Sequence, residues 1–297
     1  MLTNLELLDI ANQKLLIGDL TDNELLEFCR VANERYRNGN PIISDENYDF
    51  IFIPELVKRL PENPFLQQVE NESTGFSEEK IKLPEKMLST DKAYSWEEIN
   101  KWLERITKFS KEINYSFNSI QIKGTAKLDG FAGFDDGVKL YTRGDGKKGS
   151  DISRVFERGL GIFNDSERGQ GPGEIVVKRS YFEKHLSNHF EYPRNFQASL
   201  IKEKELDKFA INAIGNKAAL FVPFTQLPQW VGSINEFSDQ FLDIVNLLEG
   251  GVDFDIDGVV FEIVNPELKK HMGSNRKFHR WQIAFKENKE KAQVKVL

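Results

Sequence analysis

The stretch IQIKGTAKLDGFAGFDDGVKLY, residues 120–141, decides the fold class of this chain. Apolar residues alternate at Ile120 and Ile122, which is the pattern of a half-buried β-strand. Asp136-Gly137 then separates two β-prone runs, and Asp-Gly in this setting is a strong hairpin signal. The stretch therefore predicts antiparallel strands joined by tight turns.

Short β-prone runs separated by Gly- and Asp-containing turns continue from residue 119 toward the C-terminus. Further strands are expected at 174–177, 220–224 and 256–264, and a short helix at 181–190. Strands that are mainly antiparallel and accompanied by helices define the α+β class. The sequence from residue 119 onward is therefore predicted to form an α+β domain.

The chain before this region is expected to be helical. Thr21 and Glu24 have the spacing of a capping box, which opens a helix. The Asn-Gly-Asn before Pro41, together with that proline, is a strong helix breaker. A second helix is expected from about Ser44 to Leu60.

A third helix is expected near Trp96–Phe109, with Ser95 as its N-cap and Glu98 three residues further on. Residues 66–86 are polar and are expected to form a linking loop. At about 150 residues per domain, the length predicts roughly two domains. We expect a helical domain over residues 1–76 and a sheet-rich domain over residues 77–297.

Composition excludes several classes of protein. The net charge of −7 argues against a protein whose whole surface is basic and binds nucleic acid. Positive charge gathers instead at residues 266–297, which suits a local phosphate site as well as a solvated tail. Cys29 is the only cysteine, which excludes a disulfide scaffold. No apolar run approaches the ~18 residues of a membrane span, so we expect a cytoplasmic protein without a membrane partner.

Lys127-Leu-Asp129-Gly130 carries the first candidate chemistry. A lysine between a strand and a glycine turn can be held rigidly and half desolvated in a pocket, which suits a nucleophilic amine. Such a four-residue string arises by chance in roughly one chain in fifteen of this length. Taken alone, it would be interpreted as a turn with a solvated lysine.

Further blocks follow this string in a fixed order. They are Thr142-Arg143-Gly144-Asp145-Gly146, Gly173-Glu174-Ile175, Pro193-Arg194-Asn195, Phe254-Asp-Ile-Asp257-Gly-Val-Val260 and Arg280-Trp281-Gln-Ile-Ala-Phe-Lys286. Together they resemble the adenylation (nucleotidyltransferase) domain of the NAD-dependent DNA ligases. Upstream, residues 87–91 resemble that family's entry to the same domain, and residues 41–49 resemble the small N-terminal domain of its NAD-using branch.

The N-terminal block has a physical interpretation of its own. Asp45, Tyr48 and Asp49 stand at i, i+3 and i+4, so a helix would place them on one face. An aromatic ring with two carboxylates suits a pyridinium cation such as that of nicotinamide mononucleotide. The same spacing also fits an ordinary first helical turn. The resemblance favours nicotinamide recognition, with Tyr36 as a further aromatic contact.

The resemblance implies covalent catalysis. Lys127 would attack the adenylyl phosphorus of NAD, release nicotinamide mononucleotide and hold AMP as a phosphoramidate. The AMP would pass to the 5′-phosphate of nicked double-stranded DNA, where a 3′-hydroxyl would displace it. Mg²⁺ would neutralise the developing charge, although no cluster of metal-ligating side chains is predicted.

The resemblance also assigns roles to other residues. Arg143 and Glu174 match ribose contacts, and Phe224 matches the ring that stacks on adenine. Asp129 and Asp257 match acidic residues near the lysine and the metal. Lys286 and Arg280 match cations that contact the phosphates, and Arg194 matches a basic residue that contacts DNA phosphates. Leu88, Ser89 and Asp91 match a segment that lines the nucleotide pocket.

Several positions depart from the family's pattern. Glu262 stands where the family carries a lysine, and there it would repel a pyrophosphate at close range unless a nearby lysine compensates. Glu249 lies where an arginine is usual, and Thr125 replaces a glutamate. Either a neighbour such as Lys178, Lys269 or Lys270 compensates for the charge of Glu262, or the strand register differs, or catalysis is weakened.

In the family, an OB-fold, a zinc module and a helix-hairpin-helix domain follow the position of Lys286. We therefore expect either a fragment or a subunit whose partner is a second polypeptide. Two alternatives stay open: an ATP-using covalent nucleotidyltransferase, and a non-catalytic nick-binding or assembly subunit of the same fold.

Overall fold

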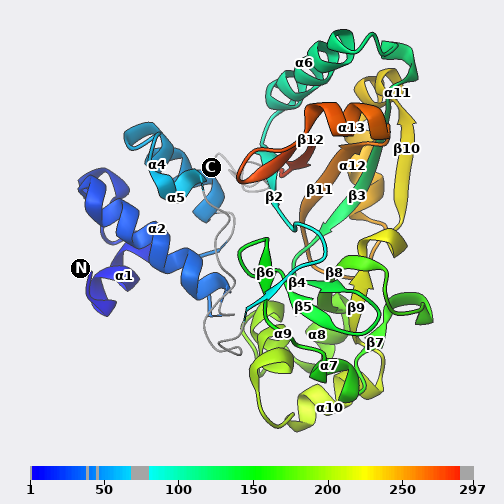
Figure 1. The fold of residues 1–297 in the computed structure, drawn as a ribbon. Helices are drawn as coiled ribbons and strands as arrows, with labels where there is room; N and C mark the ends of the chain where they lie inside the picture. The colour runs from blue at the N-terminus through cyan, green and yellow to red at the C-terminus, as the bar shows by residue number, and fades with distance from the viewer. Residues whose placement is uncertain (1, 38–39, 45–46, 68–79, 288–297) are drawn as a thin grey trace, which may run out of the picture.

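The structure, a computed structural model, describes residues 2–37, 40–44, 47–67 and 80–287. Its N-terminal part is a helical lobe that lies beside a sheet-containing body (Figure 1). The lobe consists of α1 (Asn4–Ala11), the short turn η1 (Ile17–Asp19), α2 (Asp22–Arg37), η2 (Tyr48–Phe52), α4 (Ile53–Arg59) and α5 (Pro64–Gln67).

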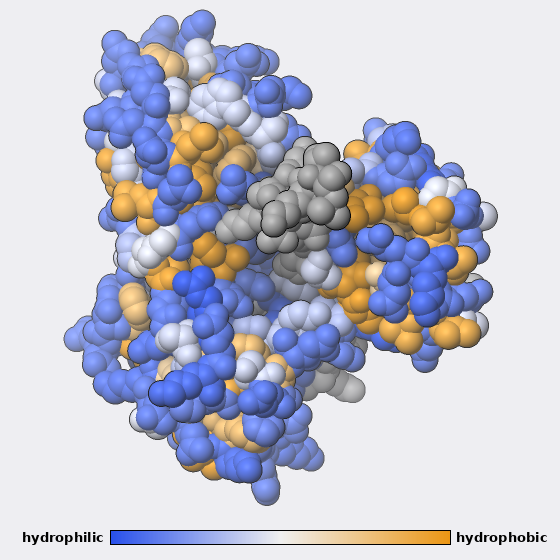
Figure 2. Space-filling view, turned by 180° about the vertical axis from the view of Figure 1, so that it is seen from behind, coloured by the Kyte–Doolittle hydropathy of each residue, from blue (hydrophilic) through white to orange (hydrophobic). Residues whose placement is uncertain are grey.

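The lobe has its own hydrophobic core. Phe28 and Leu56 are fully buried there, and Phe28 packs on Phe52 with ring centroids 4.5 Å apart. The predicted capping box opens α2: Glu24 N donates to Thr21 Oγ1 at 3.3 Å, and Thr21 N donates to the Glu24 carboxylate at 2.8 Å. In a space-filling view the lobe stands apart from the body and shows apolar residues on its surface (Figure 2).

The first sheet of the body has five strands in the order β10-β3-β11-β12-β2. Its pairs are antiparallel except β12 with β2, which is parallel. Helices α6, α11, α12 and α13 contribute to its core around Trp102, Phe237 and Phe261. The bounds are β2 (Ser89–Ala93), α6 (Trp96–Glu112), η3 (Phe117–Ser119), β3 (Gln121–Leu128), β10 (Gln229–Ser233), α11 (Ile234–Asp239), α12 (Phe241–Glu249), β11 (Ile256–Ile263), α13 (Pro266–Met272) and β12 (Phe278–Phe285).

The second sheet also has five strands, in the order β5-β4-β8-β9-β7. Its core lies around Phe131, Phe196 and Phe221. The bounds are β4 (Phe131–Asp135), β5 (Leu140–Thr142), α7 (Arg154–Glu157), β7 (Gly161–Ile162), η4 (Phe163–Asp165), β8 (Gly171–Val177), α8 (Arg179–His185), α9 (Pro193–Lys202), α10 (Lys208–Gly215), β9 (Ala219–Pro223) and η5 (Phe224–Gln226). A small two-stranded sheet pairs β1 (Ile81–Lys82) with β6 (Lys148–Gly149).

The predicted α+β class is confirmed: a helical region precedes a body rich in antiparallel strands. The predicted hairpin at Asp136-Gly137 joins β4 to β5, which pair antiparallel. Ser95 caps α6 by accepting from Glu98 N at 3.4 Å, and the helix runs to Glu112, three residues beyond the expected end.

Two expected helices differ in detail. Within the described residues, the helix expected over 44–60 is α-helical at Asn47, passes through a π-helical turn at Tyr48–Phe52 and continues as α4 from Ile53 to Arg59. The helix expected over 181–190 starts at Arg179 and ends at His185. The linking loop expected over 66–86 falls partly outside the described residues, so the boundary at residue 76 stays a prediction.

Candidate active site between the sheets and the helical lobe

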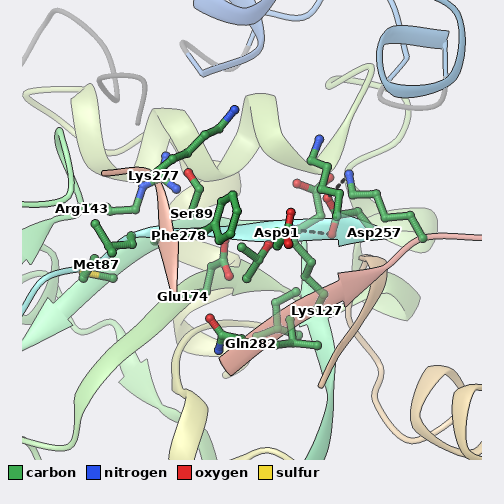
Figure 3. Close-up of a pocket in the computed structure, with 18 of the residues that line it drawn as sticks. Met87, Ser89, Asp91, Lys127, Arg143, Glu174, Asp257, Lys277, Phe278 and Gln282 are labelled. Atoms are coloured by element: carbon green, nitrogen blue, oxygen red, sulfur yellow. Dashed lines mark hydrogen bonds and ion pairs between the residues drawn. The ribbon is translucent and has the colours of Figure 1, made fainter. Parts of the chain in front are cut away.

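A cavity of about 1070 Å³ lies where both sheets meet the helical lobe. This is large compared with the roughly 300–1,000 Å³ of small-molecule sites. Strands β2, β3, β11 and β12 line it from the first sheet, β4 and β8 from the second, and Tyr36, Tyr48 and Asp49 from the lobe. Figure 3 shows side chains from these separate elements converging on the same space.

Most residues singled out from the sequence line this cavity. They are Tyr36, Tyr48, Asp49, Leu88, Ser89, Asp91, Lys127, Asp129, Arg143, Glu174, Arg194, Phe224, Asp257 and Lys286. Asp45 lies outside the described residues. Arg280 is not among the described residues that line the cavity. Its Nη1 donates to Met272 O at 3.2 Å at the end of α13.

Lys127, near the end of β3, is held by an ion pair across the sheet. Its Nζ lies 2.6 Å from Asp257 Oδ1, and Lys286 Nζ lies 2.8 Å from Asp257 Oδ2 (Figure 3). Burial alone would raise the pKa of Asp257, but the two ammonium groups outweigh it and hold that pKa well below its usual range. Asp257 therefore stays ionised and bridges the two lysines.

The backbone beside Asp257 explains the glycine that follows it. Gly258 has φ +128°, a conformation that side chains disfavour, and a Cβ there would lie 2.1 Å from Phe285 O. Only glycine fits without displacing β12. The close approach brings Asp257 of β11 beside Lys286, which directly follows β12.

Asp49 of the lobe joins this cluster from the opposite side. It is 3% exposed; its Oδ2 lies 2.5 Å from Lys286 Nζ, and its Oδ1 pairs with Lys92 Nζ. Burial would raise the pKa of Asp49, but Lys286 and Lys92 outweigh burial and lower it. Burial and Lys286 lower the pKa of Lys92 to about 8, although Asp49 opposes the shift.

A second contact between lobe and body involves Asp129. Tyr36 Oη donates to Asp129 Oδ1 at 2.7 Å, and Arg194 Nη1 lies 3.0 Å from the same oxygen. Arg194 is 7% exposed, also donates to Gly130 O at 2.6 Å, and its guanidinium lies 4.2 Å from the centroid of the Tyr36 ring. In this arrangement Tyr36 covers the arginine that was predicted to contact DNA.

Glu174 fixes the turn that follows Lys127. Gly130 N donates to Glu174 Oε1 at 3.2 Å, and Glu174 pairs in register with Ala132 across β8 and β4. A Cβ on Gly130 would lie 2.4 Å from Ile175 O, so the turn requires glycine. Arg143, which follows β5, donates its backbone N–H to Ala132 O at 3.1 Å and lines the same part of the cavity.

Glu262, one of the departures from the family pattern, lies on β11 away from the contacts around Lys127. Lys123 Nζ lies 2.6 Å from Glu262 Oε1 and Lys269 Nζ lies 3.3 Å from it. Lys269 is one of the three neighbours expected to compensate this charge. Lys123 was not among them, although it lies on the neighbouring strand β3, directly opposite Glu262.

Sequence reasoning missed three contributors to the site. Lys92 pairs with Asp49, and Tyr94 packs on Phe50 of the lobe with ring centroids 4.8 Å apart. Lys277 Nζ donates to Leu66 O at 2.6 Å and so adds a further link from body to lobe. The only signal for Lys92 and Tyr94 was their position one and three residues after Asp91, at the end of the stretch 87–91 that resembles the family.

The described residues contain no group of three or more His, Cys, Asp or Glu side chains arranged to hold a metal ion. Within the same residues, no helix is long and apolar enough to cross a membrane. A divalent ion at this site would depend on one or two carboxylates together with oxygens of the substrate, which is the usual mode for Mg²⁺.

Comparisons with known proteins identify a family and relatives that are similar to this chain. Residues 75–210 match the family described as NAD-dependent DNA ligase adenylation domain. The chain is 62% identical over 281 residues, 95% of its length, to a DNA ligase of Ruthia magnifica subsp. Calyptogena magnifica, of which the match covers 46%. It is 49% identical over 294 residues, 99% of its length, to a DNA ligase of Shewanella baltica, of which the match covers 45%. The chain therefore spans about half the length of these relatives.

Proposed function

The chain carries the adenylation domain of the NAD-dependent DNA ligases, and from this we propose that it forms a covalent lysyl-AMP from NAD at Lys127. One observation carries the proposal. A lysine, a bridging carboxylate and a second lysine meet at one side of a cavity large enough for a dinucleotide. The helical lobe lines one side of that cavity.

In the proposed step, the amine of Lys127 attacks the adenylyl phosphorus of NAD. A P–N bond forms, the P–O bond of the pyrophosphate breaks, and nicotinamide mononucleotide leaves with the bonding electron pair. Lys127 must be deprotonated to attack. The lowered pKa of Asp257 makes that carboxylate a poor acceptor, so the protons that the amine loses pass to water, which reaches this 25% exposed side chain. We assign Asp257 to orienting the amine instead.

Lys286 supplies positive charge where the leaving phosphate gains negative charge. Its ammonium faces Asp49 and Asp257. A phosphate oxygen would take the place of one carboxylate. When bound, Mg²⁺ would add a further positive charge on the phosphates, with Asp129 and Asp257 as the nearest candidate carboxylates.

The lobe is proposed to recognise the nicotinamide portion. Asp49 carries a buried negative charge that pairs with two ammonium groups, and a pyridinium would have to displace one of them to contact it. Tyr48 lines the cavity one residue away, and its Oη donates to Cys29 O at 3.2 Å, which fixes the ring. A pyridinium in contact with this ring and carboxylate would gain from both.

We further propose that AMP passes from Lys127 to the 5′-phosphate at a nick in double-stranded DNA. The proposal is supported by the name DNA ligase that the relatives carry. A phosphate could reach Arg194 only after Tyr36 withdraws, because the ring covers the guanidinium. Release of the lobe would then precede this contact.

The test is intact-mass spectrometry of purified protein incubated with NAD or with ATP. We expect an AMP adduct with NAD, its absence in Lys127→Ala, and retention in Lys178→Ala as a matched lysine control. An adduct that persists in Lys127→Ala would overturn the nucleophile, and an adduct formed only from ATP would overturn the donor.

A further inference from the structure

Two lysines of the body share a single carboxylate of the lobe. Asp49 Oδ1 pairs with Lys92 Nζ, and Asp49 Oδ2 lies 2.5 Å from Lys286 Nζ. Lys92 lines the cavity from β2, the edge strand of the first sheet that lies nearer the lobe (Figure 1). Each oxygen of Asp49 is therefore engaged by one ammonium group of the body.

The register of the first sheet places Lys92 on the same face as the nucleophile. Lys92 stands in register with Ala284 of β12, and this row continues across β11 to Thr125 of β3. Residues in register share a face of the sheet, and so do residues two apart along a strand. Lys127 and Lys286 each lie two residues beyond this row. Because β2 is three strands away from β3, the row spans about 14 Å at ~4.8 Å per strand.

Positive and negative groups alternate between Lys127 and Lys92. Lys127 contacts Asp257, Asp257 contacts Lys286, Lys286 contacts Asp49, and Asp49 contacts Lys92. A dinucleotide with its adenylyl phosphorus at Lys127 and its nicotinamide in the lobe would extend along this line. Its second phosphate would then lie between Lys286 and Lys92.

Nicotinamide mononucleotide carries a negative phosphate and a positive pyridinium. The ion pair of Lys92 and Asp49 presents the opposite charge to each of these groups. Removing one member of a buried ion pair is unfavourable because the other charge is left without a partner. A ligand that carries both charges avoids this penalty, since it gives Lys92 and Asp49 a new partner each.

We propose that nicotinamide mononucleotide, free or as part of NAD, inserts into the ion pair of Lys92 and Asp49. Its phosphate binds the Lys92 ammonium, and its pyridinium binds the Asp49 oxygen that Lys92 releases. The inference rests on the proposed function, because it takes recognition of nicotinamide by the lobe as given. A ligand with the pyridinium but no phosphate would have to leave Lys92 unpaired, so it should bind less tightly.

The experiment measures binding to the purified chain by titration calorimetry at pH 7, with nicotinamide mononucleotide and with nicotinamide riboside. The riboside has the same pyridinium and lacks the phosphate. In Lys92→Met, affinity for the mononucleotide should fall by about 10- to 100-fold, the value of a hydrogen bond to a charged group. Affinity for the riboside should not fall, because no lysine has to leave Asp49 Oδ1. The control is Lys108→Met at an exposed position of α6, which should change neither affinity.

A purely structural role for Lys92 predicts a different result. If Lys92 only held the lobe against the body, Lys92→Met would weaken both ligands by the same factor, and that outcome would overturn the inference. Lys92→Arg keeps a cation and should keep the preference for the mononucleotide over the riboside. Loss of that preference in Lys92→Arg, its absence in the unaltered chain, or unchanged affinity for the mononucleotide in Lys92→Met would also overturn it. The proposed function is judged separately, by the AMP adduct that the unaltered chain forms from NAD.

Discussion

Replacing Asp49 by asparagine removes the carboxylate that ties the helical lobe to two lysines of the body. Breaking a buried ion pair by deleting one partner costs about 3–5 kcal/mol. Lys286 would keep its contact with Asp257 at 2.8 Å. We therefore expect a loss at the lower end of this range, about 3 kcal/mol. The loss should fall on the free energy with which the lobe docks on the body, and not on the folding of the lobe or of the body.

The assay is urea unfolding together with hydrogen exchange of the lobe and the body. At pH 7, Asp49→Asn should speed exchange at the contacts around Phe50 and Tyr94, while the core around Phe237 keeps its protection. The control is Asp19→Asn, which also replaces a carboxylate by an amide but at an exposed position of the same lobe. It should change neither the urea unfolding nor the hydrogen exchange.

The pH dependence gives the sharper test. The folded pKa of Asp49 lies below its ordinary value of 3.8, so its stabilising contribution is complete above that value and is lost as pH falls through the folded pKa. The unaltered chain should lose lobe docking on acidification below about pH 4, and Asp49→Asn should lose less. Equal stability at pH 7, or an identical acid loss in both proteins, would refute the reasoning.

Other predictions concern the body. Lys127→Ala should abolish the AMP adduct while thermal unfolding stays within about 1 kcal/mol of the unaltered chain, since this side chain is 25% exposed; a large loss of stability would contradict its placement in a cavity. Gly258→Ala should destabilise by about 2–4 kcal/mol in urea unfolding, because its Cβ would lie 2.1 Å from Phe285 O at φ +128°; a neutral result would argue against the close approach of β11 and β12. Arg194→Met should cost about 3 kcal/mol by the same measurement, because Asp129 and Gly130 O lose their shared donor; unchanged unfolding would show that these bonds are not formed in solution.

Features that depend on neighbours in the sequence were predictable. The caps at Thr21 and Ser95 join residues three apart, and the turn at Asp136-Gly137 depends on local backbone preference. The α+β class followed from such patterns. Lys127 was predicted as the nucleophile because it lies between a strand and a glycine turn within the short string of residues 127–130. The family resemblance then singled out that string.

Tertiary structure alone decided which of these residues meet. Asp49 and Lys286 are 237 residues apart, yet their charged atoms lie 2.5 Å apart, and only docking of the lobe produces that contact. Glu262 looked like an isolated charge reversal until the register of β3 and β11 placed Lys123 opposite it. Spacing along a chain determines the face of a helix or strand on which a side chain lies. Its contact partner depends on strand register and on how the separate hydrophobic cores pack. Those contacts join residues that are far apart in the sequence, so no local pattern predicts them.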